Sequence, residues 1–279
     1  MAHPLSLAFL TVFDVPPPRA VQIAAECGYS AVGLRMLPSG PGQDPLPLLT
    51  DDTMLRQTRS ALHETGIRMA DLEIARLGAG VGIVGFRPFL ERGAELGARH
   101  VLVAGDDPDL SGQIDSFAQF CELARDYGMS ADLEPMPWTA VPDLARARQV
   151  VEGAAADNGA ILIDALHFCR AGDHPAALSQ VPRHLLNYAQ LCDGPVPWDP
   201  STEELIRVAR DARLLPGDGG IDLAAIIRAL PQDLIISVEV PQRALARTVS
   251  PLERAQRAYR ATVDVLTGAG RQIADRLQT

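Results

Sequence analysis

Short apolar runs alternate along the chain with segments in which apolar residues recur every three or four positions. Apolar runs without polar alternation are typical of strands that are buried on both faces of a parallel sheet. Eight such runs are predicted as strands, at residues 5–12, 31–36, 68–74, 100–104, 129–134, 159–164, 185–191 and 234–240. Their alternation with helical segments predicts repeated βαβ units.

Capping residues mark where the helices between these runs begin and end. A run of three prolines at residues 16–18 opens a helix that stops at Gly28, because proline suits a first turn and glycine follows a last one. Ser201 and Glu204 form a capping box, which starts a helix inside the long segment 192–220. Five apolar residues share one face of a helix at the 3.6-residue period: Ile114, Phe117, Cys121, Ala124 and Tyr127.

Eight strand–helix units without a change of composition predict a single (β/α)8 TIM barrel over residues 1–279, with residues 268–279 as a trailing helix or tail. A doubly wound sheet is the alternative. We prefer the barrel because eight regular units favour closure and no Gly-x-Gly-x-x-Gly follows the first strand.

The overall charge and the cysteines narrow the class of protein. The chain has 279 residues, and 35 acidic against 25 basic residues give a net charge of −10, which disfavours a nucleic-acid partner. No apolar stretch reaches 18 residues, so no membrane span is expected, and the first residues resemble a strand rather than a signal peptide. Four scattered cysteines without a Cys-x-x-Cys indicate reduced thiols in a cytoplasmic protein: Cys27, Cys121, Cys169 and Cys192.

Oxygen-bearing side chains lie at the ends of four consecutive predicted strands: Glu134, Asp164, Gln190 and Glu239. In a TIM barrel these ends meet at one cavity, where catalytic residues lie. Three carboxylates together would repel one another unless a cation shared them or some took up protons. An all-oxygen set suits Mn²⁺ or Mg²⁺ better than Zn²⁺. The alternative is that each acid forms its own ion pair at the barrel rim.

The chain resembles the xylose isomerase-like barrels, a superfamily of sugar phosphate isomerases and epimerases that also includes endonuclease IV (AP endonuclease family 2). The matching motifs span nearly the whole chain: Asp132-Leu-Glu-Pro135, Ile163-Asp-Ala-Leu-His167, Asp193, Leu215-Pro-Gly-Asp-Gly219, Ile221-Asp222 and Ser237-Val-Glu-Val240.

This resemblance implies that Glu134, Asp164 and Glu239 are metal ligands and that His167 contacts the substrate. The family usually has a histidine ligand on the seventh strand, where this chain has Gln190, whose amide oxygen can bind a hard cation more weakly. The expected cofactor is therefore Mn²⁺ or Mg²⁺, with Zn²⁺ less favoured. Such barrels often pair through loops of the active face, so a homo-oligomer is conceivable by analogy.

The function that follows is that of a metal-dependent isomerase or epimerase of a small sugar-like hydroxycarbonyl substrate. A divalent ion stabilises the enediolate that forms when a carbon proton leaves, and we assign the proton transfers to Glu134 and Glu239. The resemblance also suggests that Arg213 lies over the substrate, although from the residues alone it could be a surface helix residue. Glu73 and Trp138 are further candidates for substrate contacts, with pairing to Arg35 and ordinary loop packing as their respective alternatives.

Three other functions remain open. Apolar residues near the predicted mouth would also suit a metal-dependent lyase or dehydratase that acts on a ring, such as a dehydroshikimate-like compound. An endonuclease IV-like repair enzyme is disfavoured, because that chemistry needs several zinc ions and many histidines at the strand ends. A ligand-binding barrel that has lost catalysis is conceivable because Gln190 replaces the usual histidine.

Overall fold

A parallel sheet of nine strands forms the centre of the computed structural model, which describes residues 2–40 and 46–274. The strands follow the order β7-β6-β5-β4-β3-β2-β10-β9-β8, and every neighbouring pair is parallel. Their bounds are β2 Leu5–Leu7, β3 Ala31–Arg35, β4 Arg68–Leu77, β5 His100–Gly105, β6 Ser130–Leu133, β7 Gly159–Ile161, β8 Ile163–Asp164, β9 Tyr188–Leu191 and β10 Ile235–Val238.

The two outer strands of that order, β7 and β8, are consecutive in the chain and are separated only by Leu162. The amide of Leu162 still donates to the carbonyl of Leu133 on β6, at 3.0 Å. β7 and β8 are therefore two halves of one stave, which joins the two ends of the sheet. The result is an eight-stave barrel, so the predicted TIM barrel is confirmed.

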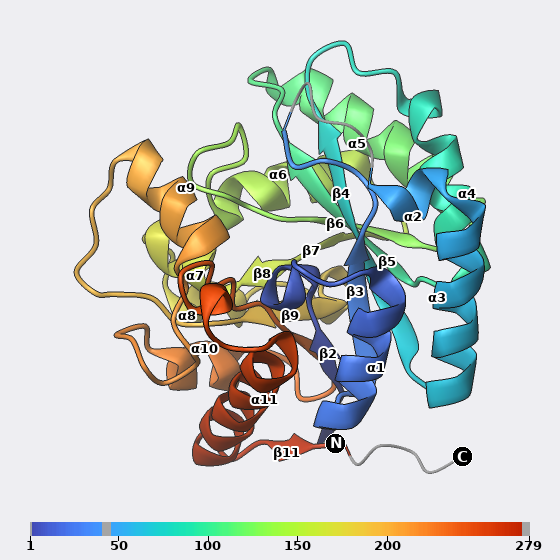
Figure 1. Cartoon of the computed structure of the whole chain (residues 1–279). Coiled ribbons are helices and arrows are strands. Elements are labelled where there is room, and N and C mark those ends of the chain that lie inside the picture. The colour runs from blue at the N-terminus through green and yellow to red at the C-terminus, as the bar shows by residue number, and fades with distance from the viewer. Residues whose placement is uncertain (1, 41–45, 275–279) are drawn as a thin grey trace.

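Helices surround this barrel in the order expected for βα units (Figure 1). Their bounds are α1 Pro17–Cys27, α2 Pro47–Thr50, α3 Asp52–Thr65, α4 Arg87–Glu95, α5 Leu110–Arg125, α6 Leu144–Ala154, α7 Ala165–Arg170, α8 Pro175–Leu178, α9 Thr202–Asp211, α10 Leu223–Ala229 and α11 Pro251–Gly268. Two of them begin where the sequence predicts, since Ser201 caps α9 and the proline run opens α1, which ends before Gly28.

Within the described residues, four short 3-10 helices lie between these elements: η1 Phe9–Val12, η2 Ile83–Phe86, η3 Arg183–Leu185 and η4 Leu245–Arg247. Two of them replace parts of predicted strands. The seventh predicted strand, 185–191, narrows to β9 because η3 precedes it.

The first predicted strand, 5–12, is wrong in its second half. β2 ends at Leu7, and η1 turns the chain across the end of the barrel. The hydroxyl of Thr11 donates to the carbonyl of Val238 at 2.8 Å and accepts from the amide of Val240 at 2.8 Å. These bonds hold η1 against the end of β10, so the apolar run continues as buried helix rather than strand.

Other strands differ from the prediction by one or two residues at their ends, and two differences are larger. β4 runs to Leu77 instead of residue 74, and its pairing with β5 shifts between Leu72 and Ala75. The segment after α11 contains a short strand, β11 Gln272–Ile273, which pairs in parallel with β1 Ala2–His3 beside the start of the barrel (Figure 1). The end of the predicted tail, residues 275–279, lies outside the described residues.

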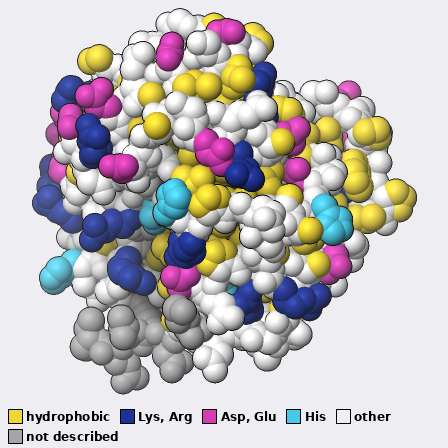
Figure 2. All heavy atoms as spheres, turned by 180° about the vertical axis from the view of Figure 1, so that it is seen from behind, with side chains coloured by type: hydrophobic (Ala, Val, Ile, Leu, Met, Phe, Trp, Pro, Cys, Tyr) yellow, Lys and Arg dark blue, Asp and Glu magenta, His cyan; other side chains and the backbone are white. Residues whose placement is uncertain are grey.

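Apolar side chains form two cores, one between the barrel and its helices and a smaller one inside the barrel. The inner core consists of Ile74, Leu102, Ala104, Met136, Leu162 and Tyr188. On the face shown in Figure 2, apolar side chains are visible between interspersed basic and acidic groups. Among the described residues, no helix combines the length and hydropathy needed to cross a membrane.

Candidate functional site

The barrel stave formed by β7 and β8 ends in Asp164, which is also the N-cap of α7. One carboxylate oxygen of Asp164 accepts from the backbone amides of Leu166, at 2.8 Å, and His167, at 3.0 Å. These two hydrogen bonds fix the carboxylate of Asp164. They also hold the first turn of α7 in an orientation that places the His167 side chain beside this carboxylate. The Asp-x-x-His motif is therefore a strand end followed directly by a helix start.

Glu134 follows β6 and lies next to this pair. Single ligand atoms of Glu134, Asp164 and His167 all lie within 4.8 Å of one another, and the three residues are buried. The His167 Nε2 atom is 3.8 Å from Glu134 Oε1, and His167 Nδ1 has no hydrogen-bond partner within the described part of the chain. His167 thus joins the compact group of potential ligands, whereas the sequence indicated only a substrate contact.

Gln190, on the neighbouring strand β9, connects two of these carboxylates. With its amide nitrogen turned toward them, Gln190 donates to Asp164 Oδ2 at 3.2 Å and to Glu134 Oε1 at 3.1 Å. Asp164 and Gln190 are direct register partners on β8 and β9, which explains why their side chains meet. The amide occupies the place that the sequence predicts for a fourth ligand, although here its nitrogen faces the acids.

Arg213 lies in the middle of the site and is only 2% exposed. Its guanidinium pairs with Asp164 at 2.5 Å and with Glu239 at 2.9 Å, while its Nε donates to the carbonyl of Ala209 at 2.8 Å. The surface alternative for Arg213 is therefore wrong. Arg213 supplies a positive charge between two of the predicted metal ligands.

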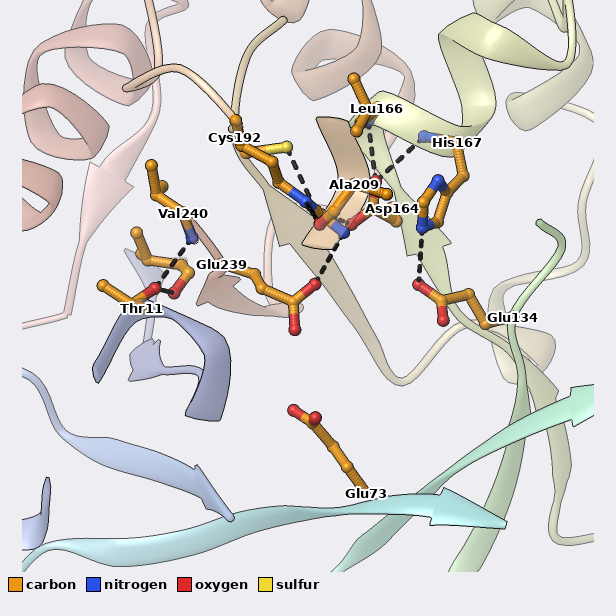
Figure 3. A network of polar contacts seen from close by, with 12 residues as sticks. Thr11, Glu73, Glu134, Asp164, Leu166, His167, Cys192, Ala209, Glu239 and Val240 are labelled. Atoms are coloured by element: carbon orange, nitrogen blue, oxygen red, sulfur yellow. Dashed lines mark hydrogen bonds and ion pairs between the residues drawn. The ribbon is translucent and has the colours of Figure 1, made fainter. Parts of the chain in front are cut away.

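Glu73 reaches the same space from β4. Figure 3 shows its carboxylate pointing toward the gap between Glu239 and Glu134, which face each other from opposite sides. One oxygen of Glu73 accepts from Arg35 at 2.6 Å, as the pairing alternative predicts, and the other has no hydrogen-bond partner among the described residues. Glu73 therefore pairs with Arg35, and its contact with the substrate stays a prediction.

Burial and mutual repulsion change the acidity of this cluster. Burial raises the pKa of Glu134 well above its usual value, and Asp164 and Glu239 raise it further. Burial likewise raises the pKa of Glu239 to about 8, against the opposing effect of Arg213. Burial also disfavours ionised Asp164, but Arg213 and His167 more than offset it, so the Asp164 pKa is lowered. Burial lowers the pKa of His167 to about 4, which leaves its imidazole neutral.

A small cavity that is open to solvent lies over these groups. Trp138 forms part of its wall and meets His167 edge to face, with ring centroids 4.9 Å apart. The other lining residues are apolar, basic or acidic, apart from one serine: Leu10, Arg35, Ser39, Ile74, Arg76, Leu102, Glu134, Met136, Ala209, Arg210, Arg213 and Glu239, besides His167 itself. The eight predicted site residues therefore converge on one region, and their individual roles stay predictions.

Sequence reasoning missed two arginines of this wall and the structural role of one carboxylate, Asp193. Arg76 lies beyond residue 74, where the predicted strand ended, and Arg210 lies on a helix without a motif of its own. Asp193 accepts from the amides of Gly194 at 2.8 Å, Gly217 at 3.0 Å and Ile221 at 3.1 Å. Asp193 matched the family pattern, but its role is to hold the loop that follows Arg213.

The charge of the site fits a divalent cation. Glu73 is neutralised by Arg35, which leaves Glu134, Asp164 and Glu239 against the single guanidinium of Arg213. When all are ionised, the buried centre carries an excess of two negative charges, which is costly without a counterion. Two carboxylates and a neutral imidazole form a donor set that Mn²⁺, Mg²⁺ or Zn²⁺ accepts, so the donor set does not select the metal.

Residues 21–267 match the family model described as xylose isomerase-like TIM barrel. Because this match covers most of the chain, the protein belongs to that family. No curated protein matches the chain.

Solved structures of the same fold agree with this membership. The IolI protein with a bound zinc atom superimposes with a TM-score of 0.79 at 20% identity, covering 95% of this chain and 99% of that one. A D-allulose 3-epimerase from Methylomonas sp., in complex with D-allulose, gives 0.67 at 15% identity over 94% and 97%. The probable 3-DHS dehydratase AsbF from Bacillus anthracis gives 0.73 at 14% identity over 94% and 99%. At these identities, the likeness shows the fold.

Proposed function

We propose that this protein is a divalent-metal-dependent isomerase or epimerase of a small hydroxycarbonyl substrate. The observation that supports the proposal most directly is the buried centre in which three carboxylates face one guanidinium at the carboxyl ends of the barrel strands. Neighbours that are named as an epimerase and a dehydratase share this fold. An excess of two negative charges in a buried centre is suited to hold a divalent ion.

Glu134, Asp164 and His167 would hold the ion, and the roles of Gln190 and Glu239 as further ligands stay predictions. When bound, the ion would withdraw electrons from the carbonyl and the adjacent hydroxyl of the substrate and so stabilise an enediolate. Coordination through Gln190 would require its amide oxygen, rather than the nitrogen, to face the centre.

Glu134 and Glu239 would move the proton. Their carboxylates face the cavity from opposite sides, as Figure 3 shows, which is the arrangement needed to remove a proton from one face of a carbon and return it to the other. Burial raises the pKa of both groups, so each can hold a proton near neutral pH. Arg213, fixed between Asp164 and Glu239, would orient the substrate oxygen beside Glu239.

Exchange of a substrate proton with solvent is the direct test. The purified protein is incubated in D₂O with Mn²⁺ or Mg²⁺ and a panel of ketoses and smaller hydroxyketones, and deuterium at the carbon next to the carbonyl is followed by NMR. Glu134→Gln and Glu239→Gln should each lower the exchange rate by about 100-fold or more, because each removes a proton-transfer group. Glu152→Gln, an exposed glutamate paired with Arg148, is the matched control and should exchange at the wild-type rate.

Unaltered exchange in either site variant would remove the proton-transfer assignment. Exchange that survives complete removal of divalent ions would remove the metal dependence. Metal binding without exchange of any panel member would favour a ligand-binding barrel instead.

A metal-dependent dehydratase or lyase acting on a ring is a second candidate. It is favoured by the apolar side of the cavity, where Ile74, Leu102, Met136 and Trp138 form a wall that suits a ring better than an open-chain sugar. The first step would be the same removal of a proton beside a carbonyl. Loss of one water from the product, measured by mass spectrometry, would distinguish this reaction from an isomerisation, which leaves the mass unchanged.

A further inference from the structure

Arginines gather on the cavity wall beyond the acidic centre. Arg35 comes from β3, Arg76 from β4 and Arg210 from the last turn of α9. The long segment after β9 therefore supplies two arginines. Arg213, which lies two residues after the end of α9, pairs with the carboxylates, and Arg210, three residues before it, lines the cavity. The proposed isomerase or epimerase function uses Arg213 and leaves Arg210 without a role.

The three outer arginines differ in their partners. Arg35 is paired with Glu73 at 2.6 Å, and Arg76 is paired with Asp106 at 2.7 Å. Arg210 makes no ion pair or hydrogen bond with any residue that the structure describes. The adjacent carboxylate of Asp211 is paired with Arg243 at 2.5 Å.

Keeping Arg210 at this position costs free energy. The side chain is half-buried, and its pKa is lowered by burial and then by the charges of Arg76 and Arg35. A guanidinium that loses water and stands near two like charges is destabilised unless an anion meets it. The charge of Asp211 opposes this shift, but the Asp211 carboxylate is paired with Arg243, and Arg210 lines the cavity.

We propose that the substrate carries an anionic group, a carboxylate or a phosphate, and that Arg210 binds this group while the hydroxycarbonyl end lies between Glu134 and Glu239. This inference rests on the proposed function, because a divalent ion would balance the acidic centre and leave the charge of Arg210 in excess. Arg76, which is paired with Asp106, lies close enough to Arg210 for its charge to lower the Arg210 pKa, and it would strengthen the attraction. Guanidinium groups suit both anions because they bind them through two parallel hydrogen bonds.

The direct test compares ligands that differ only in charge and that the enzyme cannot turn over. D-gluconate and D-glucitol have the same carbon chain, but gluconate has a carboxylate in place of one hydroxymethyl group; D-glucitol 6-phosphate supplies the phosphate arm. Binding is measured calorimetrically in saturating Mg²⁺. The wild type should bind at least one of the two anions about tenfold or more tightly than glucitol, as expected for a charge-assisted pair.

Arg210→Gln should lose about tenfold or more of the affinity for the preferred anion and less than about twofold of that for glucitol. Arg207→Gln is the matched control, because Arg207 is exposed one turn earlier on α9, pairs with Glu204 and lies outside the cavity. This variant should bind all three ligands like the wild type. Preference for gluconate would identify a carboxylate, and preference for glucitol 6-phosphate would identify a phosphate.

The inference is overturned if neither anion binds more tightly than glucitol, if neither binds measurably, or if Arg210→Gln keeps the wild-type preference. Because the measurement needs no turnover, its result is separate from the exchange experiment. Anion binding that depends on Arg210 together with failed exchange would reject only the proposed reaction. Exchange of neutral hydroxyketones together with no anion preference would reject only the role of Arg210.

Discussion

Arg213 decides the electrostatic balance of the candidate site at the scale of single residues. Its guanidinium meets Asp164 and Glu239 inside the barrel mouth, where the three side chains are almost fully buried. Removing one partner of a buried ion pair is far more costly than replacing the whole pair, because the remaining charges have no counterion. Arg213 therefore stabilises the fold by keeping Asp164 ionised and by opposing the rise in the pKa of Glu239.

Arg213→Met is expected to lower the free energy of unfolding of the metal-free protein by about 3–5 kcal/mol at neutral pH. Arg213→Lys should lose less than half as much, because it retains one charge but not the two-sided contact. Urea denaturation of both variants and the wild type measures the difference. A loss below about 1 kcal/mol for Arg213→Met would show that the ion pairs do not stabilise the fold.

The pKa of Glu239, raised to about 8, also predicts how stability depends on pH. An acid whose pKa is higher in the folded state keeps a proton that the unfolded chain has released, so stability falls as pH rises toward the folded pKa. His167 has the opposite effect, but only between its folded pKa of about 4 and its unfolded value of about 6.5. The window from about pH 6.5 to 8 therefore isolates the buried acids.

Within that window, the metal-free wild type should lose stability with rising pH, and Glu239→Gln should lose about 1.4 kcal/mol less per pH unit. Urea denaturation at pH 6.5, 7.0, 7.5 and 8.0 provides the slopes, with Glu152→Gln as the control that keeps the wild-type slope. Equal slopes in wild type and Glu239→Gln would mean that Glu239 titrates normally in the folded protein.

At the scale of elements, the loop after α9 is organised around Asp193. The carboxylate of Asp193, which is 1% exposed, accepts three backbone amides, and its backbone forms two hydrogen bonds with Leu214. A Cβ at Gly219 would lie 2.3 Å from this carboxylate and 2.4 Å from the carbonyl of Gly194, so only glycine fits there. The loop thus holds Leu214, and with it the neighbouring Arg213, in one position.

Asp193→Ala should destabilise the protein by about 2–4 kcal/mol, because several buried amides lose a charged acceptor. It should also weaken any activity that depends on Arg213. The control is Asp218→Ala, an exposed acid of the same loop, which should change stability by no more than about 0.5 kcal/mol. Thermal and urea denaturation measure both variants, and equal stabilities for the two would contradict this account of the loop.

The strand-end acids could be predicted from the sequence because neighbouring parallel strands end at the same edge of the barrel. Polar residues at those ends therefore lie at about the same height. Asp164 and Gln190 are register partners, and Gln190 is in turn the partner of Ser237, two residues before Glu239. His167 is brought to Asp164 because α7 begins directly after Asp164. That helix start is hard to recognise in the sequence, since the apolar residues Ala165 and Leu166 look like a continuation of the strand. The direction of the Gln190 amide and the insertion of Arg213 depend on contacts across the barrel, so local sequence patterns do not predict them.

At the scale of the whole molecule, closure of the barrel brings charged side chains that are far apart in the sequence, from Glu73 to Glu239, into one buried centre. The same β/α repeat that makes the fold predictable leaves irregular details open, such as η1 after β2 and the extension of β4. These departures occur at the mouth of the barrel, where η1 and the extended strand add Leu10 and Arg76 to the cavity wall. The regular part of the fold is therefore more predictable than the part that selects a substrate.

Binding of a divalent ion should stabilise the entire barrel, since an ion that binds only the folded state raises its stability by mass action. At a concentration of 100 times the dissociation constant, the gain is about 2.7 kcal/mol, which corresponds to a rise in Tm of roughly 5–10 °C for a chain of this size. Mn²⁺, Mg²⁺ and Zn²⁺ are compared by thermal denaturation after treatment with a chelator. The largest shift at equal concentration identifies the preferred metal.

The matched variant for this experiment is Glu134→Gln combined with Asp164→Asn, which keeps the shape of the site but removes two of the three grouped ligands. Its Tm should be insensitive to all three ions, whereas Glu152→Gln should respond like the wild type. An equal shift in the double variant would place the ion elsewhere on the molecule. If no ion shifts the wild type, the excess negative charge is instead balanced by protons on Glu134 and Glu239, in line with their raised pKa values.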